Sequence, residues 1–281
     1  MTAGFELALR VTLLALALDP PLLWFERLPV VLAAALGLAV PAALRSPALW
    51  IGLAALTAWP VAYRWPFADN HEYLNVLWCL SVALALATRA PAALGAHHAR
   101  RLVGLVFLFA ALWKLVLSPD FVDGRFFRMT LLSDARFEAL AVAAGGMTFE
   151  EWAANDDAID ALVTEAAPPE AFHLIEPPGV RRLAWLLTLF TGALEAALAA
   201  AFLAPLGTVL ARARDALLLL FLFSTFSFAT VQGFGWLLVA LGLAQCTADR
   251  PRTRAAYLAA FALVALYRAT PWADALLSLA D

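Results

Sequence analysis

Nine apolar stretches run through this sequence, separated by prolines and charged residues, and they constrain its fold more than any other feature. A helix needs roughly 20 apolar residues to cross the hydrocarbon layer of a bilayer, and most of the stretches approach that length. They cover residues 5–24, 28–44, 48–63, 72–88, 102–118, 183–205, 215–231, 233–247 and 255–269. We therefore expect an all-α polytopic transmembrane helical bundle of about nine spans, forming a single domain over 1–281.

Composition supports this expectation. The chain is 64% hydrophobic and 15% charged, whereas soluble domains are nearer half apolar and a quarter charged. A surface that faces lipid accounts for the excess of apolar residues. The first stretch carries Arg10 and lacks a small-residue cleavage site, which predicts a retained helix and no signal peptide. The short link between 215–231 and 233–247 leaves open that one of the two is re-entrant.

Charges in the connecting segments predict an orientation. Arginines gather in alternate short connections, namely Arg45; Arg89, Arg100 and Arg101; Arg212 and Arg214; and Arg250, Arg252 and Arg254. Basic connections favour the cytoplasmic side, so we expect the N-terminus inside. Residues 119–180 then form an extracytoplasmic insertion. Their twelve acidic residues and three arginines, a net charge of −9, suit the outer side.

The insertion 119–180 contains one clear helix signal. Thr148 and Glu151 have the spacing of a capping box, in which each side chain bonds a backbone N–H of the other residue. Apolar residues follow at roughly helical spacing: Phe149, Trp152, Ile159 and Val163. We expect a short amphipathic helix that serves either as a lid or as a packed connector.

Other patterns argue against several kinds of site. The net charge of −3 gives no footprint of nucleic-acid binding, so the expected partner is the lipid bilayer. Cys79 and Cys246 fall in apolar stretches, which predicts packing residues and no disulfide. His97 and His98 lack a third ligand nearby, so we expect no metal site there, and contact with lipid headgroups is the simpler interpretation.

Four ionisable residues lie in or beside the apolar stretches, where charges are costly and usually face the interior of the bundle: Arg10, His71, Lys114 and Glu195. Arg10 and Glu195 are expected to form a structural intramembrane ion pair. Lys114 is the one lysine among nineteen basic residues, and it falls roughly 6 Å below the outer boundary, at a depth similar to that of His71. The alternatives to function are snorkelling of Lys114 to the interface and a capping or headgroup role for His71.

Three segments in order along the chain, Leu9–Pro20, Asn70–Leu74 and Phe107–Gly124, carry a family resemblance. The second reads Asn70-His71-Glu72-Tyr73-Leu74, and the third contains Lys-Leu followed by Pro-Asp-Phe-Val-Asp-Gly. These resemble the opening helix, the Asn-His-x-Tyr-Leu helix start and the Lys-Leu, Asp-Trp-x-Glu-Gly pattern of the vitamin K-dependent γ-carboxylase family. Bacterial relatives are the HTTM-domain proteins, which implies a multi-pass protein of a bacterial cytoplasmic membrane.

The resemblance also implies a chemistry. The family oxidises a reduced quinone with O2 to generate a strong base, which removes a proton from a peptide glutamate so that CO2 adds. Lys114 would deprotonate the hydroquinone and His71 would assist, with reduced vitamin K or menaquinol as cofactor and no metal. An amine in surroundings of low dielectric releases its proton more readily than one in water, which agrees with this role. The residues expected around the quinone or substrate are Asn70, Tyr73, Asn75, Phe121 and Trp236.

Some positions depart from the family pattern. Phe121 and Asp123 stand where the family has tryptophan and glutamate, and Phe223-Ser224 lacks a histidine that the family carries there. The sequence also contains no counterpart of the large lumenal domain that holds the protein substrate. These departures keep a second hypothesis open, namely a non-enzymatic HTTM membrane module or a maturation or export partner for a secreted peptide.

Overall fold

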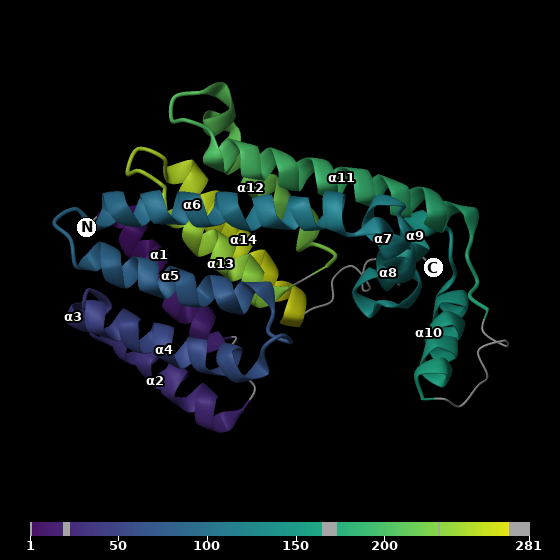
Figure 1. Ribbon diagram of the computed structural model, residues 1–281, viewed down its shortest axis with the longest axis horizontal. Coiled ribbons are helices and arrows are strands. Elements are labelled where there is room, and N and C mark those ends of the chain that lie inside the picture. Colours follow the sequence, from purple (N-terminus) through teal and green to yellow (C-terminus); the bar gives the residue numbers. More distant parts are fainter. Residues whose placement is uncertain (1, 19–22, 165–172, 230, 270–281) are drawn as a thin grey trace.

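The computed structural model describes residues 2–18, 23–164, 173–229 and 231–269, and the regular elements within these ranges are all helical. Each of the nine apolar stretches overlaps one long helix, so the all-α prediction is confirmed (Figure 1). These helices are α1 (Ala3–Leu18), α2 (Trp24–Ala39), α4 (Pro47–Arg64), α5 (Asn70–Leu86), α6 (Pro91–Leu112), α11 (Pro178–Leu203), α12 (Val209–Thr225), α13 (Gln232–Ala244) and α14 (Pro251–Ala269).

Local sequence explains where many of these helices begin. Proline occupies the first position of several, where its missing N–H costs no hydrogen bond and its fixed φ suits the helix. These are α3 (Pro41–Leu44), α4, α6, α7 (Pro119–Val122), α11 and α14. Helix α5 begins with a capping interaction, in which the backbone N–H of Asp69 donates to the carboxylate of Glu72 at 2.9 Å.

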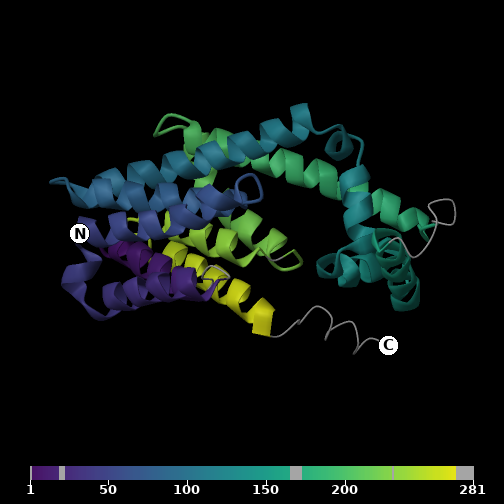
Figure 2. The same ribbon diagram turned by 60° about the horizontal axis from the view of Figure 1, so that its bottom comes forward.

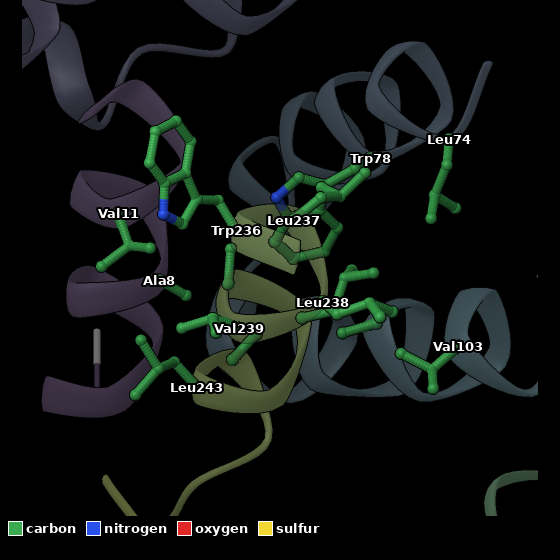
Figure 3. Close-up of a cluster of buried hydrophobic side chains, with 14 of the residues drawn as sticks. Ala8, Val11, Leu74, Trp78, Val103, Trp236, Leu237, Leu238, Val239 and Leu243 are labelled. Carbon is green, nitrogen blue, oxygen red and sulfur yellow. The ribbon is translucent and has the colours of Figure 1, made fainter. Parts of the chain in front are cut away.

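Helix α13 forms the centre of the bundle. Eleven of its thirteen residues are buried, and a helix that is apolar all round is a core helix. It packs against α1, α5, α6 and α14, and Figure 3 shows Leu238 and Val239 among side chains of the neighbouring helices. Beside it, Nε1 of Trp78 in α5 donates to the hydroxyl of Thr12 in α1 at 2.9 Å, which satisfies both buried polar groups.

Two glycines let helices approach α13 more closely than larger residues would. A Cβ atom on Gly4 of α1 would lie 2.2 Å from the carbonyl oxygen of Cys246, just after α13. A Cβ atom on Gly242 of α13 would lie 2.4 Å from the ring of Tyr257 in α14. Small residues at helix contacts are typical of closely packed helical bundles, including those in membranes.

The insertion contains four helices, where the sequence predicted one. They are α7, α8 (Arg125–Ser133), α9 (Glu138–Gly145) and α10 (Phe149–Val163), with a 3₁₀ turn over Ala135–Phe137. Figures 1 and 2 both place them at one end of the molecule. They share a small apolar core with the start of α11, made of Phe121, Phe127, Leu131, Leu132, Phe137, Ala141, Met147, Trp152, Val180 and Ala184. Helices α7, α8 and α9 escaped prediction because they have 4, 9 and 8 residues, which is too short to show a helical period.

The capping box that begins α10 is confirmed. The backbone N–H of Thr148 donates to Glu151 at 2.9 Å, and the backbone N–H of Glu151 donates to the Thr148 hydroxyl at 3.1 Å. The predicted apolar stripe is only partly buried, since Trp152 lies in the core and Val163 is 75% exposed. Helix α10 therefore packs through its first half.

Polar contacts tie the insertion to the segment before α11. The buried amide of Asn155 in α10 donates to the carbonyl of Ile175 at 2.9 Å and accepts from its N–H at 2.7 Å. Arg128 of α8 donates to both oxygens of Glu176, at 2.8 and 2.5 Å, and Arg181 lies 3.5 Å from the same carboxylate. Burial acts to raise the pKa of Glu176, but the two arginines outweigh it and hold that pKa below its usual range. The insertion is thus a packed connector in this structure.

Helix lengths bear on the nine-span prediction. Among the described helices, α11 is the one whose length and apolar composition suffice to cross a membrane, and α13 is apolar but has 13 residues. Helices α1 and α2 have 16 residues each, about 24 Å, which is less than the hydrocarbon thickness of about 30 Å. Length and composition thus leave the nine-span arrangement as a proposal.

Candidate functional site

A cavity of about 630 Å³ opens between α5, α6 and α11. Its polar lining comes from the start of α5, from the turn that follows α6 and from α11: Asp69, Asn70, His71, Tyr73, Lys114 and Glu195. The remaining wall is apolar and consists mainly of leucine, valine and phenylalanine side chains from α5 and α6, together with Val231 and Phe234 at the start of α13. A concave site of this volume, with mostly apolar walls and a few convergent polar groups, is typical of small-molecule binding.

The only lysine and the only acid of α11 meet in this cavity. Nζ of Lys114 donates to Oε1 of Glu195 at 2.5 Å, a short charge-assisted hydrogen bond. The side chain of Glu195 is 5% exposed and that of Lys114 is 27% exposed, so the carboxylate lies deeper than the ammonium. Removing two charges from water is costly, and a pair this close recovers that cost only with good geometry.

The expected ion pair between Arg10 and Glu195 is therefore wrong. Arg10 donates to Glu6 at 3.0 Å, one helical turn away on α1, and Glu6 also accepts from Arg45 at 3.1 Å. The physical reason is the packing of α11 along α6, which turns Glu195 toward Lys114. Arg10 is 40% exposed and is satisfied locally, so it has no need of a partner from another part of the bundle.

Lys114 lies in an unusual piece of helix. Helix α6 continues as a π-helical turn over Trp113–Leu117, and such turns are rare and frequent at functional sites. The wider turn changes the direction of the side chains within it, so Lys114 reaches across to α11. On its other side, Nζ lies 5.4 Å from the centre of the Phe121 ring in α7, within the range of a cation–π contact.

One buried polar atom of the cavity remains without a partner among the described residues. Oε2 of Glu195 is buried and accepts no hydrogen bond from any of them. A buried acceptor without a donor is costly in a native structure, and it calls for an explanation.

The structure brings together four of the predicted site residues. Lys114, His71, Asn70 and Tyr73 line one cavity although they come from two helices. They do so because α5 and α6 are antiparallel neighbours, which sets the start of α5 beside the end of α6 (Figure 1). Their placement agrees with the similar depth expected for Lys114 and His71.

Other predicted residues lie elsewhere. Trp236 is buried in the centre of the bundle, where its Nε1 donates to the carbonyl of Phe261 at 3.2 Å and its ring stacks on the Phe261 ring. The prediction that Trp236 lines the pocket is therefore wrong. Phe234, two residues earlier, lines the cavity in its stead. Phe121 contacts Lys114 from outside the cavity lining, and Asn75 is not part of that lining.

Glu195 is the residue whose place in the site the sequence did not reveal. It is the one acid in the stretch 183–205, as Lys114 is the one lysine of the chain, and this signal marked both as unusual. Pairing them required knowing which helices pack together. Comparisons with protein-family models, with curated proteins and with solved structures found no match for this chain.

Proposed function

We propose that this chain is a multi-pass membrane protein whose cavity binds a reduced, lipid-soluble quinone. We propose further that the Lys114–Glu195 pair takes up a proton from a hydroxyl group of this hydroquinone. One observation carries the proposal, namely a buried ion pair in the wall of a largely apolar cavity. Ionisable groups inside a membrane protein usually serve function, because they are costly to keep there.

The surface of the bundle supports the membrane part of the proposal. Leu28, Leu32 and Leu36 follow one another at i, i+4 spacing on α2, and each is more than half exposed. Exposed apolar side chains also lie on α4, α5, α6 and α11, including Ile51, Leu84, Phe109, Leu186 and Leu189. So much contiguous apolar surface is a liability in water, whereas lipid tails cover it at no cost.

Aromatic side chains mark one end of the bundle. Trp24, Trp59, Trp65, Phe67 and Trp113 are each more than 60% exposed. The hydroxyl of Tyr63 donates to Glu26 at 2.6 Å, which sets the start of α2 beside the end of α4, and the cavity joins the start of α5 to the end of α6. Exposed tryptophans at one level are typical of the boundary between membrane and water. Lys114 follows Trp113 directly, so its cavity belongs near that boundary.

Basic residues mark the other end. Arg100, near the middle of α6, donates to the carbonyl of Ala204, just after the end of α11. Arg250 donates to Asp215 at 3.1 Å, which sets the start of α14 beside the start of α12. The basic connections thus gather opposite the acidic insertion. This separation supports an orientation with the N-terminus inside and residues 119–180 outside.

The cavity fits the proposed ligand by its chemistry. A reduced quinone supplies a flat apolar ring with hydroxyl groups that can release protons. The leucine and phenylalanine walls suit the ring, and Asn70, His71 and Tyr73 offer hydrogen-bonding groups on the same cavity. Reduced vitamin K and menaquinol both answer this description. The family resemblance adds two steps to the proposal, namely oxidation by O2 and carboxylation of a peptide glutamate with CO2. The peptide would meet the insertion, which contacts Lys114 through Phe121.

The test uses the purified full chain in lipid nanodiscs with reduced menaquinone. We expect oxygen-dependent quinol oxidation, together with incorporation of labelled bicarbonate into a peptide rich in glutamate. Lys114→Met should abolish both when assayed below its unfolding temperature, which should fall because the buried carboxylate of Glu195 loses its partner. Absence of quinol binding and turnover in the wild type, with every quinone tried, would overturn the proposal.

A second candidate is a non-enzymatic membrane module or a maturation partner for a secreted peptide. It is favoured by the observation that the ion pair between Lys114 and Glu195 joins the end of α6 to α11. A double variant, Lys114→Met with Glu195→Leu, distinguishes the two, because apolar residues of similar volume often replace a buried pair without loss of stability. A stable double variant that keeps its cellular role would support the module, and one that loses its role would support the quinone site.

A further inference from the structure

The wall of the cavity holds one buried acceptor that the protein leaves free. Oε1 of Glu195 takes the hydrogen bond from Lys114, and Oε2 of the same carboxylate has no donor among the described residues. Glu195 is 4% exposed as a whole and lines the cavity. Because a buried carboxylate oxygen without a donor is costly, a donor from a bound ligand explains why this arrangement persists.

We infer that Glu195 determines which form of the ligand binds, because its Oε2 accepts a hydrogen bond from a ligand hydroxyl. The inference rests on the proposed function and deepens it. A reduced quinone carries O–H donors that can meet Oε2. An oxidised quinone presents only acceptor oxygens, which would face the carboxylate with no hydrogen between them. The site therefore selects the reduced form.

The same geometry assigns the destination of the proton. Nζ of Lys114 already shares its proton with Oε1, so the free basic atom of the pair is Oε2. When the ligand releases its proton, its O–H bond breaks and a new O–H bond forms on Oε2. The ammonium of Lys114 keeps its charge and faces the negative charge left on the ligand oxygen. Lys114 then stabilises charge, and Glu195 is the proton acceptor.

We expect this selection to produce a large difference in affinity between the reduced and the oxidised ligand. A site built to bond a hydroxyl rejects an analogue that lacks it far more strongly than an apolar pocket rejects an altered methyl group. Glu195→Gln keeps the volume of the side chain and replaces one oxygen by an amide that donates. That variant should favour the oxidised ligand, because its amide can bond a quinone carbonyl.

The experiment measures equilibrium binding of three probes to the full chain in nanodiscs, without oxygen and corrected with empty nanodiscs. The probes are menadiol, menadione and the dimethyl ether of menadiol. We expect the wild type to bind menadiol at least about tenfold more tightly than either of the others. Glu195→Gln should lose this preference. Glu26→Gln, a change of a buried glutamate outside the cavity, should retain it.

Each outcome decides a different claim. Equal binding of menadiol and its ether by the wild type would overturn the inference and leave the proposed quinone site standing. A preference for menadiol that survives in Glu195→Gln would also overturn it. Binding of no probe at all would overturn the proposed function itself. Should Glu195→Gln fail to fold, the comparison of menadiol with its ether in the wild type still decides the inference.

Discussion

The ammonium of Lys114 and the carboxylate of Glu195 lie 2.5 Å apart, although 81 positions separate them in the sequence. Their contact joins the end of α6 to α11 and lies in the wall of a cavity that His71 also lines. The pair leaves one carboxylate oxygen free and buried. This contact changes the role that we expect for Lys114. A protonated amine that is paired with a carboxylate can stabilise negative charge on a ligand, but it cannot act as a base until it loses its proton.

Substitutions of Lys114 separate these two roles. Arginine keeps the positive charge but does not release its proton at accessible pH. If Lys114 stabilises charge and Glu195 accepts the proton, Lys114→Arg should retain a measurable share of quinol turnover, while Lys114→Met should lose about a hundredfold or more. The measurement is the rate of quinol oxidation by purified protein. Equal loss in both variants would return the role of base to Lys114.

Removing the carboxylate should destabilise the fold. Glu195→Ala leaves Lys114 without its partner, and breaking a buried pair costs about 3–5 kcal/mol. Because Lys114 is 27% exposed and can turn toward the interface, we expect about 2–3 kcal/mol. The measurement is denaturant unfolding in a mild detergent. Arg10→Ala is the control, since that pair lies on a more exposed surface and should cost less than about 1 kcal/mol.

The insertion should loosen in acid. Hydrogen bonds from Arg128 and Arg181 outweigh burial and hold the pKa of Glu176 below its ordinary value of 4.5. Since the folded pKa is the lower one, the pairing stabilises the protein above pH 4.5 and is lost as pH falls through the folded pKa.

Glu176→Gln should therefore lower the unfolding temperature near neutral pH, and the gap to the wild type should close as the pH falls through the lowered pKa of Glu176. Asp157→Asn, an exposed change on α10, serves as the control. A gap that stays constant with pH would show that Glu176 acts through packing alone.

A single added methyl group should disturb the packing of the insertion against α11. A Cβ atom on Gly179 would lie 2.2 Å from the backbone oxygen of Gly145 in α9, and neither backbone can move far. We expect Gly179→Ala to cost about 1–3 kcal/mol and to expose the arginines of α8 to trypsin. Gly52→Ala in α4, where the new methyl group would meet nothing within 4 Å, should be neutral or stabilising.

The orientation can be tested with single cysteines. Ala154→Cys on α10 and Leu206→Cys between α11 and α12 are exposed positions at opposite ends of the bundle. In intact cells a membrane-impermeant reagent should label the first and spare the second, and the native cysteines should stay silent because both are buried. Labelling of both positions would overturn the proposed orientation.

Sequence alone determined the helices of the bundle. Apolar stretches and prolines at first positions are local signals, and they located the nine helices of the bundle that the structure describes. The capping box of Thr148 and Glu151 was equally local and was confirmed. Lys114 and His71 also stood out from the sequence, because a rare charge in an apolar stretch is conspicuous without any structure.

Tertiary structure decided the partners. Four ionisable residues of the apolar stretches allowed several pairings, and the pattern could not reveal that Arg10 turns to Glu6 while Glu195 meets Lys114. Trp236 was wrongly placed in the pocket for a related reason, since α13 lies at the centre and presents Phe234 to the cavity. A local pattern fixes which residues share a helix. The direction each side chain faces depends on how the helices pack around one another, and here also on the π-helical turn that carries Lys114.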